Sequence, residues 1–202
     1  MIGCLAVLAP RGVEVALAST SVLGYVTPKH RALGGQPMVL GLSLAAFTQL
    51  HVLISLVGIV AGVVFFAGAV AGRWPRFANA VFLIFTVLTS VTGFFFPPKP
   101  IGPPFIFGVI SLVALAVACF ALFGRHGVGR WRLVYLAPAL FAQWLNTVVL
   151  VVQSFQKIPA LNALAPTGTE PPFLLTQGVV AILVAYAAWV LLWRNRNVAL
   201  AV

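Results

Sequence analysis

His51 is the residue of this sequence best suited to bind a ligand, because it lies in a long apolar stretch, TQLHVLISLVGIVAG. An imidazole can donate a hydrogen bond to a small polar group or to a neighbouring helix. Other polar side chains occur near the corresponding ends of their own apolar segments: Gln49, Thr89, Ser90, Gln153 and Gln177. One interpretation is therefore a pocket for a quinone or similar amphipathic ligand, in which His51 donates a hydrogen bond to a carbonyl.

The same polar side chains also have a structural interpretation. Ser, Thr, Asn and Gln commonly form hydrogen bonds between membrane helices, and small residues let helices approach closely. Because polar groups are costly in hydrocarbon, polar residues at helical spacing should face the interior of a bundle. Three such stripes occur: Thr48, His51, Ser55, Gly58 and Gly62; Thr86, Ser90 and Gly93; and Gln143, Asn146 and Gln153. The sequence leaves both interpretations open.

The elements that must position these residues follow from the composition, which is 62% hydrophobic and only 7% charged. A soluble domain carries about 25% charged residues. Apolar runs of the roughly 20 residues needed to cross a bilayer occur at about 43–72, 77–96, 105–124, 133–156 and 173–193. Because the bilayer offers no water to peptide groups, each run must be a helix. We predict an all-α integral membrane bundle of five transmembrane helices, which form one domain over residues 38–202.

The orientation of the spans follows from the basic residues between them. The positive-inside rule assigns the connections that are rich in Lys and Arg to the cytoplasm. Rich and poor connections alternate, as five spans require, so we predict an external N-terminus and a cytoplasmic C-terminus. The rich segments contain Arg73 and Arg76, then Arg125, Arg130 and Arg132, and finally Arg194 and Arg196, whereas the poor connections contain Lys99 and Lys157.

Several function classes lose support from what the sequence lacks. The net charge of +10 is spread over short connections, and a nucleic-acid-binding stripe of basic residues is absent. Proton-coupled carriers, ion pumps and most channels depend on charged residues inside their spans, and the five interiors contain none. The chain also has no HExxH motif for zinc, no CxxC pair and no second intramembrane histidine for haem. We expect a protein that is not an enzyme and whose sequence requires no cofactor or metal.

The longest connection, Ser154–Phe173, contains Lys157 and one of the two acidic residues of the chain, Glu170. Glu170 precedes Pro171 and Pro172, and an acidic residue before such a helix start meets the positive end of the helix dipole. The pattern therefore favours a helix cap at Glu170. The segment IPALNALA is compatible with a short helix in the membrane interface.

Residues 1–37 differ from the rest of the chain. They contain charged residues at four positions but no apolar run of spanning length: Arg11, Glu14, Lys29 and Arg31. Three basic residues would then lie outside, against the positive-inside rule. Our hypothesis is that residues 1–37 are an N-terminal extension and that translation starts at Met38, and the alternative is a short disordered external tail. The mass of the intact native protein tests this hypothesis, because it shows whether the chain begins at or just after Met38. A peptide of the native protein that includes Arg11 would contradict the hypothesis.

Three segments also resemble a known family. TQLHVLISLVGIVAG, TSVTGFFFP and LVVQSFQKIPALNALAPTGTEPPF are similar to segments of small multi-span membrane proteins of proteobacteria. The resemblance extends from about Leu42 to Tyr186 and omits the N-terminal segment. It implies a location in the bacterial inner membrane, and it implies no activity and no catalytic residues.

Three functions are compatible with these observations. The first is a structural or accessory subunit that contacts the lipid bilayer and another membrane protein, or a second copy of itself. The second is a binding or redox-support protein that holds a quinone-like ligand near His51. The third is a small-molecule permease, which the absence of intramembrane charges disfavours.

The alternating basic connections predict the result of a topology experiment. Reporter fusions near Gly127 and after Arg196 should be active as cytoplasmic fusions, and a fusion near Ala165 should be active in the periplasm. Alkaline phosphatase activity from a fusion after Arg196 would contradict the predicted orientation.

Overall fold

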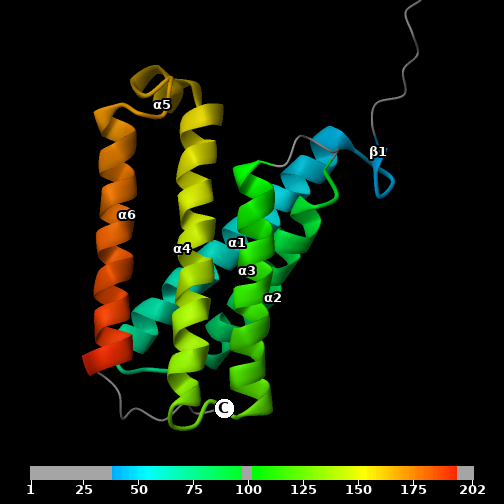
Figure 1. The fold of residues 1–202 in the computed structure, drawn as a ribbon. Helices are drawn as coiled ribbons and strands as arrows, with labels where there is room; N and C mark the ends of the chain where they lie inside the picture. Colours follow the sequence, from blue (N-terminus) through cyan, green and yellow to red (C-terminus); the bar gives the residue numbers. More distant parts are fainter. Residues whose placement is uncertain (1–37, 97–101, 195–202) are drawn as a thin grey trace, which may run out of the picture. The chain divides into compact units, whose positions relative to one another are not determined.

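The computed structural model describes residues 38–96 and 102–194 of the chain. Five of its segments are long and apolar enough to cross a membrane, as the sequence predicts, so the chain is a multi-pass integral membrane protein. Most of the described residues are helical and only two short strands occur among them (Figure 1), which confirms the all-α fold class. The helices are α1 (Leu44–Val70), α2 (Arg76–Gly93), α3 (Pro103–Cys119), α4 (Trp131–Lys157), α5 (Pro159–Leu164) and α6 (Pro171–Trp189), and π-helical turns extend α3 through Phe120–Gly124 (η1) and α6 through Val190–Arg194 (η2).

Glycine and proline set the ends of these helices. After α1, Gly72 adopts a φ of 76°, a left-handed conformation that glycine tolerates best. This places the Arg73 N–H 2.8 Å from the Gly68 carbonyl and the Gly72 N–H 3.1 Å from the Ala69 carbonyl. These two bonds form a Schellman motif, which satisfies carbonyls that a helix end would otherwise leave unpaired. Prolines begin α3, α5 and α6, where the missing N–H costs nothing.

A small hairpin that the sequence did not predict precedes α1. Strands β1 (Met38–Val39) and β2 (Leu42–Ser43) pair antiparallel. Leu40 and Gly41 both have positive φ, at 52° and 80°, as a tight two-residue hairpin turn requires. Ser43 then caps α1 by accepting a hydrogen bond from the Ala46 N–H. The hairpin therefore fixes the direction in which the chain enters the first span.

The polar connections alternate between the two ends of the bundle. The Arg-rich end carries Arg73 and Arg76 between α1 and α2, Arg125 and Arg130 between α3 and α4, and Arg194 in η2. The opposite end, which we call the α5 end, carries the Lys157–Glu170 connection with α5 (Figure 1). Packing differs along the chain as well, because α1 packs mainly against α2, α3 mainly against α4, and α6 mainly against α4.

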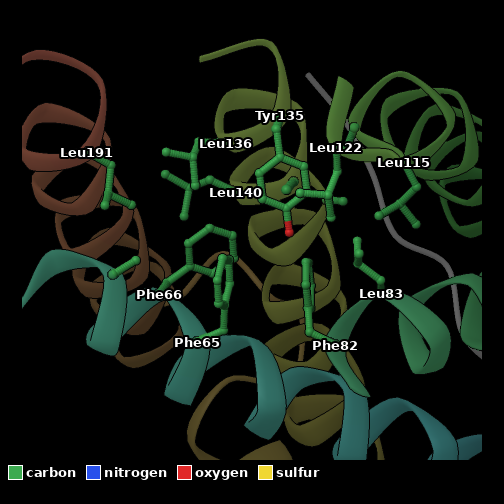
Figure 2. Packing of buried hydrophobic residues seen from close by; sticks show 14 of the residues in the cluster. Phe65, Phe66, Phe82, Leu83, Leu115, Leu122, Tyr135, Leu136, Leu140 and Leu191 are labelled. Atoms are coloured by element: carbon green, nitrogen blue, oxygen red, sulfur yellow. The ribbon is translucent and has the colours of Figure 1, made fainter. Parts of the chain in front are cut away.

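The closely packed hydrophobic core lies toward the Arg-rich end. Phe65 of α1 is fully buried, and its ring lies 4.8 Å from the ring of Trp74 and 6.3 Å from those of Phe82 and Tyr135, measured between centroids. Figure 2 shows Phe65, Phe82 and Tyr135 among leucines that come from α2, α3, η1, α4 and η2. Those leucines are Leu83, Leu115, Leu122, Leu136, Leu140 and Leu191.

Halfway along α1, one amide joins this helix to α4. The Gln143 side chain of α4 donates a hydrogen bond from Nε2 to the Ile59 carbonyl at 3.1 Å. It lies across Gly62, where a Cβ would come within 2.1 Å of Gln143 Oε1 and 2.8 Å of the Phe82 ring of α2. Glycine at this position is therefore what allows α1, α2 and α4 to meet.

The prediction that the polar stripes face the bundle interior is confirmed in the middle of the helices and wrong at their ends. Gly58, Gly62, Thr86, Ser90 and Gln143 are buried. In contrast, Thr48, Gly93 and Gln153 are exposed. The exposed members lie within about two turns of a helix end, where water is close enough to solvate a polar side chain in a bilayer.

Candidate functional site

His51 is half-buried near the start of α1, where it contacts the end of α2. Its Nδ1 lies 2.8 Å from the hydroxyl oxygen of Thr92. The ring of Phe96 stands edge-on to the imidazole, with 5.1 Å between the ring centroids. Gly93 lies beside the imidazole, and a Cβ there would make an ordinary contact at 3.8 Å with the His51 Cε1 atom. His51 therefore joins α1 to α2 in the way expected of an interhelical hydrogen bond.

The hydrogen bonds of Thr92 determine which nitrogen of His51 carries the proton. The Thr92 hydroxyl lies 2.7 Å from the Leu88 carbonyl, which can only accept, so its single proton is directed there. Thr92 Oγ1 must then accept from His51, which assigns a proton to Nδ1. Nε2 is left with a lone pair and has no hydrogen-bond partner among the described residues. Neutral His51 can therefore accept a hydrogen bond from a ligand, whereas the sequence had suggested a donor.

Three of the predicted site residues lie on the same two helices as His51. Gln49 is exposed and precedes His51 by two residues on α1. Thr89 is half-buried, and its hydroxyl donates to the Phe85 carbonyl of its own helix at 2.8 Å. Ser90 is buried on α2. The direct hydrogen-bond contact with His51 comes instead from Thr92, which the prediction omitted.

Gln153 and Gln177 lie on α4 and α6. Gln177 Nε2 donates to the Val148 carbonyl of α4 at 3.3 Å, so this amide fastens α6 to α4. Gln153 is exposed in the last turns of α4. In Figure 1 the first turns of α1 lie beside α2 and β1, away from the ends of α4 and α6 that meet α5. The structure therefore divides the predicted site residues into two groups.

Four polar atoms deep in the helices have no hydrogen-bond partner among the described residues. They are Thr86 Oγ1, Ser111 Oγ, Gln143 Oε1 and Asn146 Nδ2. Thr86 and Ser111 are almost completely buried, at 0% and 2% exposure. Buried groups of this kind are normally paired with protein or water. The middle of the bundle therefore contains buried polar atoms that no described residue pairs.

Two interactions at the Arg-rich end were missed by sequence reasoning. Arg132 lies within the first turn of α4, which begins two residues earlier than predicted, and is buried. Its Nη1 donates to the Leu191 carbonyl in η2 at 3.1 Å, where the negative end of α6 favours a cation. The buried Tyr135 hydroxyl donates to the Asn79 side chain of α2. The sequence offered one sign of these contacts, which is that Asn79 was an isolated polar residue in an apolar half-span.

Glu170 occupies the N-cap position of α6, but its side chain does not bond to the helix. Instead, Oε1 accepts from the Thr167 N–H at 3.0 Å and the Thr167 hydroxyl at 2.8 Å, and Oε2 accepts from the Thr169 N–H at 3.0 Å. Pro171 and Pro172 have no N–H, so the helix start needs fewer acceptors, and the Glu170 carbonyl serves the next two N–H groups. The carboxylate therefore organises the preceding loop, in which Gly168 has a φ of 74°.

The other predictions for this region have mixed outcomes. The short helix in IPALNALA is confirmed as α5, with Leu164 exposed. Lys157 is exposed at the end of α4. The proposed extension at residues 1–37 and the connection with Lys99 lie outside the described residues. Among the described residues, no group of three or more His, Cys, Asp or Glu side chains is close enough to hold a metal ion.

Comparison with known proteins adds no relative: no family model, curated protein or solved structure matches this chain.

The hydrogen bonds around Glu170 predict an unusual titration. Partial desolvation raises the pKa of this carboxyl, but the bonds donated by the Thr167 N–H and hydroxyl, by its own N–H and by the Thr169 N–H outweigh it and lower the pKa from 4.5 to about 2. Because the folded pKa lies below the unfolded one, the ionised carboxylate stabilises the loop above about pH 4.5, and this contribution is lost as the pH falls toward 2.

Carboxyl-selective ¹³C labelling of glutamate makes this measurable, because the chain has only two acidic side chains, Glu14 and Glu170. A Glu14→Gln variant assigns the signals. The Glu170 signal should titrate near pH 2, and Thr167→Val should raise its midpoint, because this change removes one of the donors. The control Thr176→Val removes a hydroxyl bonded within α6 and should leave the midpoint unchanged. A wild-type midpoint near 4.5 would contradict the loop geometry.

Proposed function

We propose that this protein is a non-catalytic accessory subunit of the bacterial cytoplasmic membrane, which binds another membrane protein through α6. The observation that carries the proposal is the position of α6 at the edge of the bundle. Only 11% of its span is buried, whereas the other four spans are 28–39% buried. No residue between Pro171 and Trp189 is classed as buried. One whole side of this helix is available to a partner.

The residues on the open side of α6 favour a helix as the partner. Gly178, Ala181 and Ala185 recur at intervals of three and four residues and therefore share one face. Ala181 and Ala185 are exposed, and a Cβ added at Gly178 would meet no atom within 4 Å. Lipid tails gain nothing from small residues, whereas a second helix needs them in order to approach closely. Ile182, at 70% exposure, stands beside this face.

Site-specific photo-crosslinking tests the proposal in native membranes. A photoreactive residue at Ile182 should give one protein adduct of defined mass, whereas the same residue at the exposed Val113 of α3 should give none. Ala181→Leu should reduce the adduct about fivefold or more, because overpacking a helix contact costs about 1–3 kcal/mol. Ala116→Leu, an equivalent change on the exposed face of α3, is the control.

The crosslinking result distinguishes three situations. A heteromeric adduct that Ala181→Leu weakens supports an accessory subunit. An adduct with the mass of two copies of this chain would show that α6 binds a second copy of the chain and not a different protein. Labelling of lipid alone at Ile182 would contradict the proposal.

A second candidate function, binding of an amphipathic ligand at His51, has one observation in its favour. The Thr92 contact leaves His51 Nε2 as an acceptor without a partner among the described residues. A group that donates a hydrogen bond suits this nitrogen, so the hydroxyl of a quinol fits it better than the carbonyl of a quinone. The described residues show no comparable feature in favour of a permease.

Binding of reduced and oxidised quinone to the purified protein tests this second candidate. Wild-type protein should bind the quinol more tightly, and His51→Ala should abolish this preference. Thr92→Val should weaken it, because Nδ1 then loses the acceptor that fixes its proton, whereas the control Thr89→Val removes only a bond within α2. If His51→Ala lowers stability by about 0.5–2 kcal/mol and each folded molecule still binds normally, the histidine is structural.

A further inference from the structure

A recess of about 340 Å³ opens between two helix ends at the Arg-rich end. One wall is the end of α1 with its following turn, and the other is the last part of α6 with η2. In Figure 1 the end of α1 reaches the red end of α6. Of the side chains that line the recess, only Tyr186 and Arg194 are polar, and the remaining lining residues are Val70, Ala71, Gly72 and Val190.

None of the described residues places a carboxylate within reach of Arg194. Glu170 is the single acidic residue of the described ranges, and it stands at the opposite end of α6. The 24 residues of the Pro171–Arg194 span separate the two charges by about 35 Å at 1.5 Å per residue. A counter-charge for the guanidinium must therefore come from outside the described chain. At a membrane surface the abundant anion is the phosphate of a lipid headgroup, which a guanidinium binds through paired hydrogen bonds.

The end of α1 adds acceptors to the same recess. The Schellman motif at Gly72 uses the carbonyls of Gly68 and Ala69, and the Ala71 N–H uses that of Ala67. Within the described residues, no hydrogen bond is donated to the carbonyls of Val70 and Ala71. These two carbonyls form the negative end of the helix dipole and favour a cation or another hydrogen-bond donor.

The recess thus combines an anion-binding arginine with carbonyls that favour a donor. We propose that it binds a phospholipid headgroup that carries both a phosphate and an N–H donor, as phosphatidylethanolamine does. The phosphate contacts Arg194 and the Tyr186 hydroxyl, and the ammonium group contacts the carbonyls at the end of α1. A choline headgroup has the same phosphate but no N–H, so it lacks the second set of hydrogen bonds. This site is separate from the α6 face of the accessory-subunit proposal.

Lipid titration of the full-length chain in detergent, followed by native mass spectrometry, tests the site. Phosphatidylethanolamine should bind about tenfold more tightly than phosphatidylcholine, and Arg194→Gln should weaken it about tenfold, as expected for the loss of charge-assisted hydrogen bonds. Arg130→Gln is the matched control, because it removes an equal charge from the same end at a residue that does not line the recess. Tyr186→Phe, a milder change at an exposed side chain, should weaken binding by about fivefold.

Each remaining outcome contradicts the proposal. Equal binding by the Arg194→Gln and Arg130→Gln variants would exclude Arg194 as the phosphate ligand. Equal affinity for the ethanolamine and choline lipids would show that the α1 carbonyls do not accept hydrogen bonds from the headgroup. Displacement of the lipid by soluble phosphoethanolamine at equal concentration would show that the site recognises a free phosphate ester and not a membrane lipid. If Arg194→Gln does not fold, unchanged binding in Tyr186→Phe overturns the assignment.

Discussion

The arrangement of the helices depends on the contact between Gln143 and the backbone of α1 beside Gly62. An amide in the middle of a bilayer is costly unless it is hydrogen-bonded, and the bond from Nε2 to the Ile59 carbonyl supplies that partner. The contact needs a residue without a Cβ at position 62, because the side chain occupies that space. It therefore fixes where α4 lies on α1. Because α1 crosses α4 obliquely in Figure 1, the two helices diverge on either side of this point.

This divergence gives the two halves of the bundle different properties. On the Arg-rich side the helix ends converge on Phe65, Phe82 and Tyr135, and the buried polar side chains there form hydrogen bonds, Tyr135 with Asn79 and Arg132 with the Leu191 carbonyl. On the α5 side the helices separate into a pair that holds His51 and another that holds Gln177. A closely packed half thus supports a half in which the helices stand further apart. A helix partner or a small ligand can bind only to surfaces that are not buried in the protein's own core. Such surfaces occur on α6 and around His51.

The sequence was sufficient to predict the spans because a bilayer restricts the backbone to helices and the apolar runs have the required length. It was also sufficient to predict which polar residues in mid-span turn inward, because hydrocarbon penalises the alternative. It was not sufficient for the pairing of helices, which depends on the crossing at Gly62. For that reason Gln153 and Gln177 were grouped with His51, although they lie on the other pair of helices. The proton on His51 was unpredictable for a related reason, since it is set by Thr92 and Leu88 from another helix.

Because the described residues contain so few carboxylates, their basic side chains must be stabilised by other groups. In the described ranges the single acidic side chain, Glu170, is used within its own loop, where it accepts hydrogen bonds from the N–H groups of Thr167 and Thr169 and from the Thr167 hydroxyl. Arg132 uses the Leu191 carbonyl, and Arg125 lies over the Trp131 ring at 4.8 Å, so basic side chains are stabilised by dipoles and aromatic faces. Such partners orient a cation but do not neutralise its charge. The described part of the Arg-rich end therefore carries a positive field, and the phosphate surface of a bilayer is an environment that balances such a field.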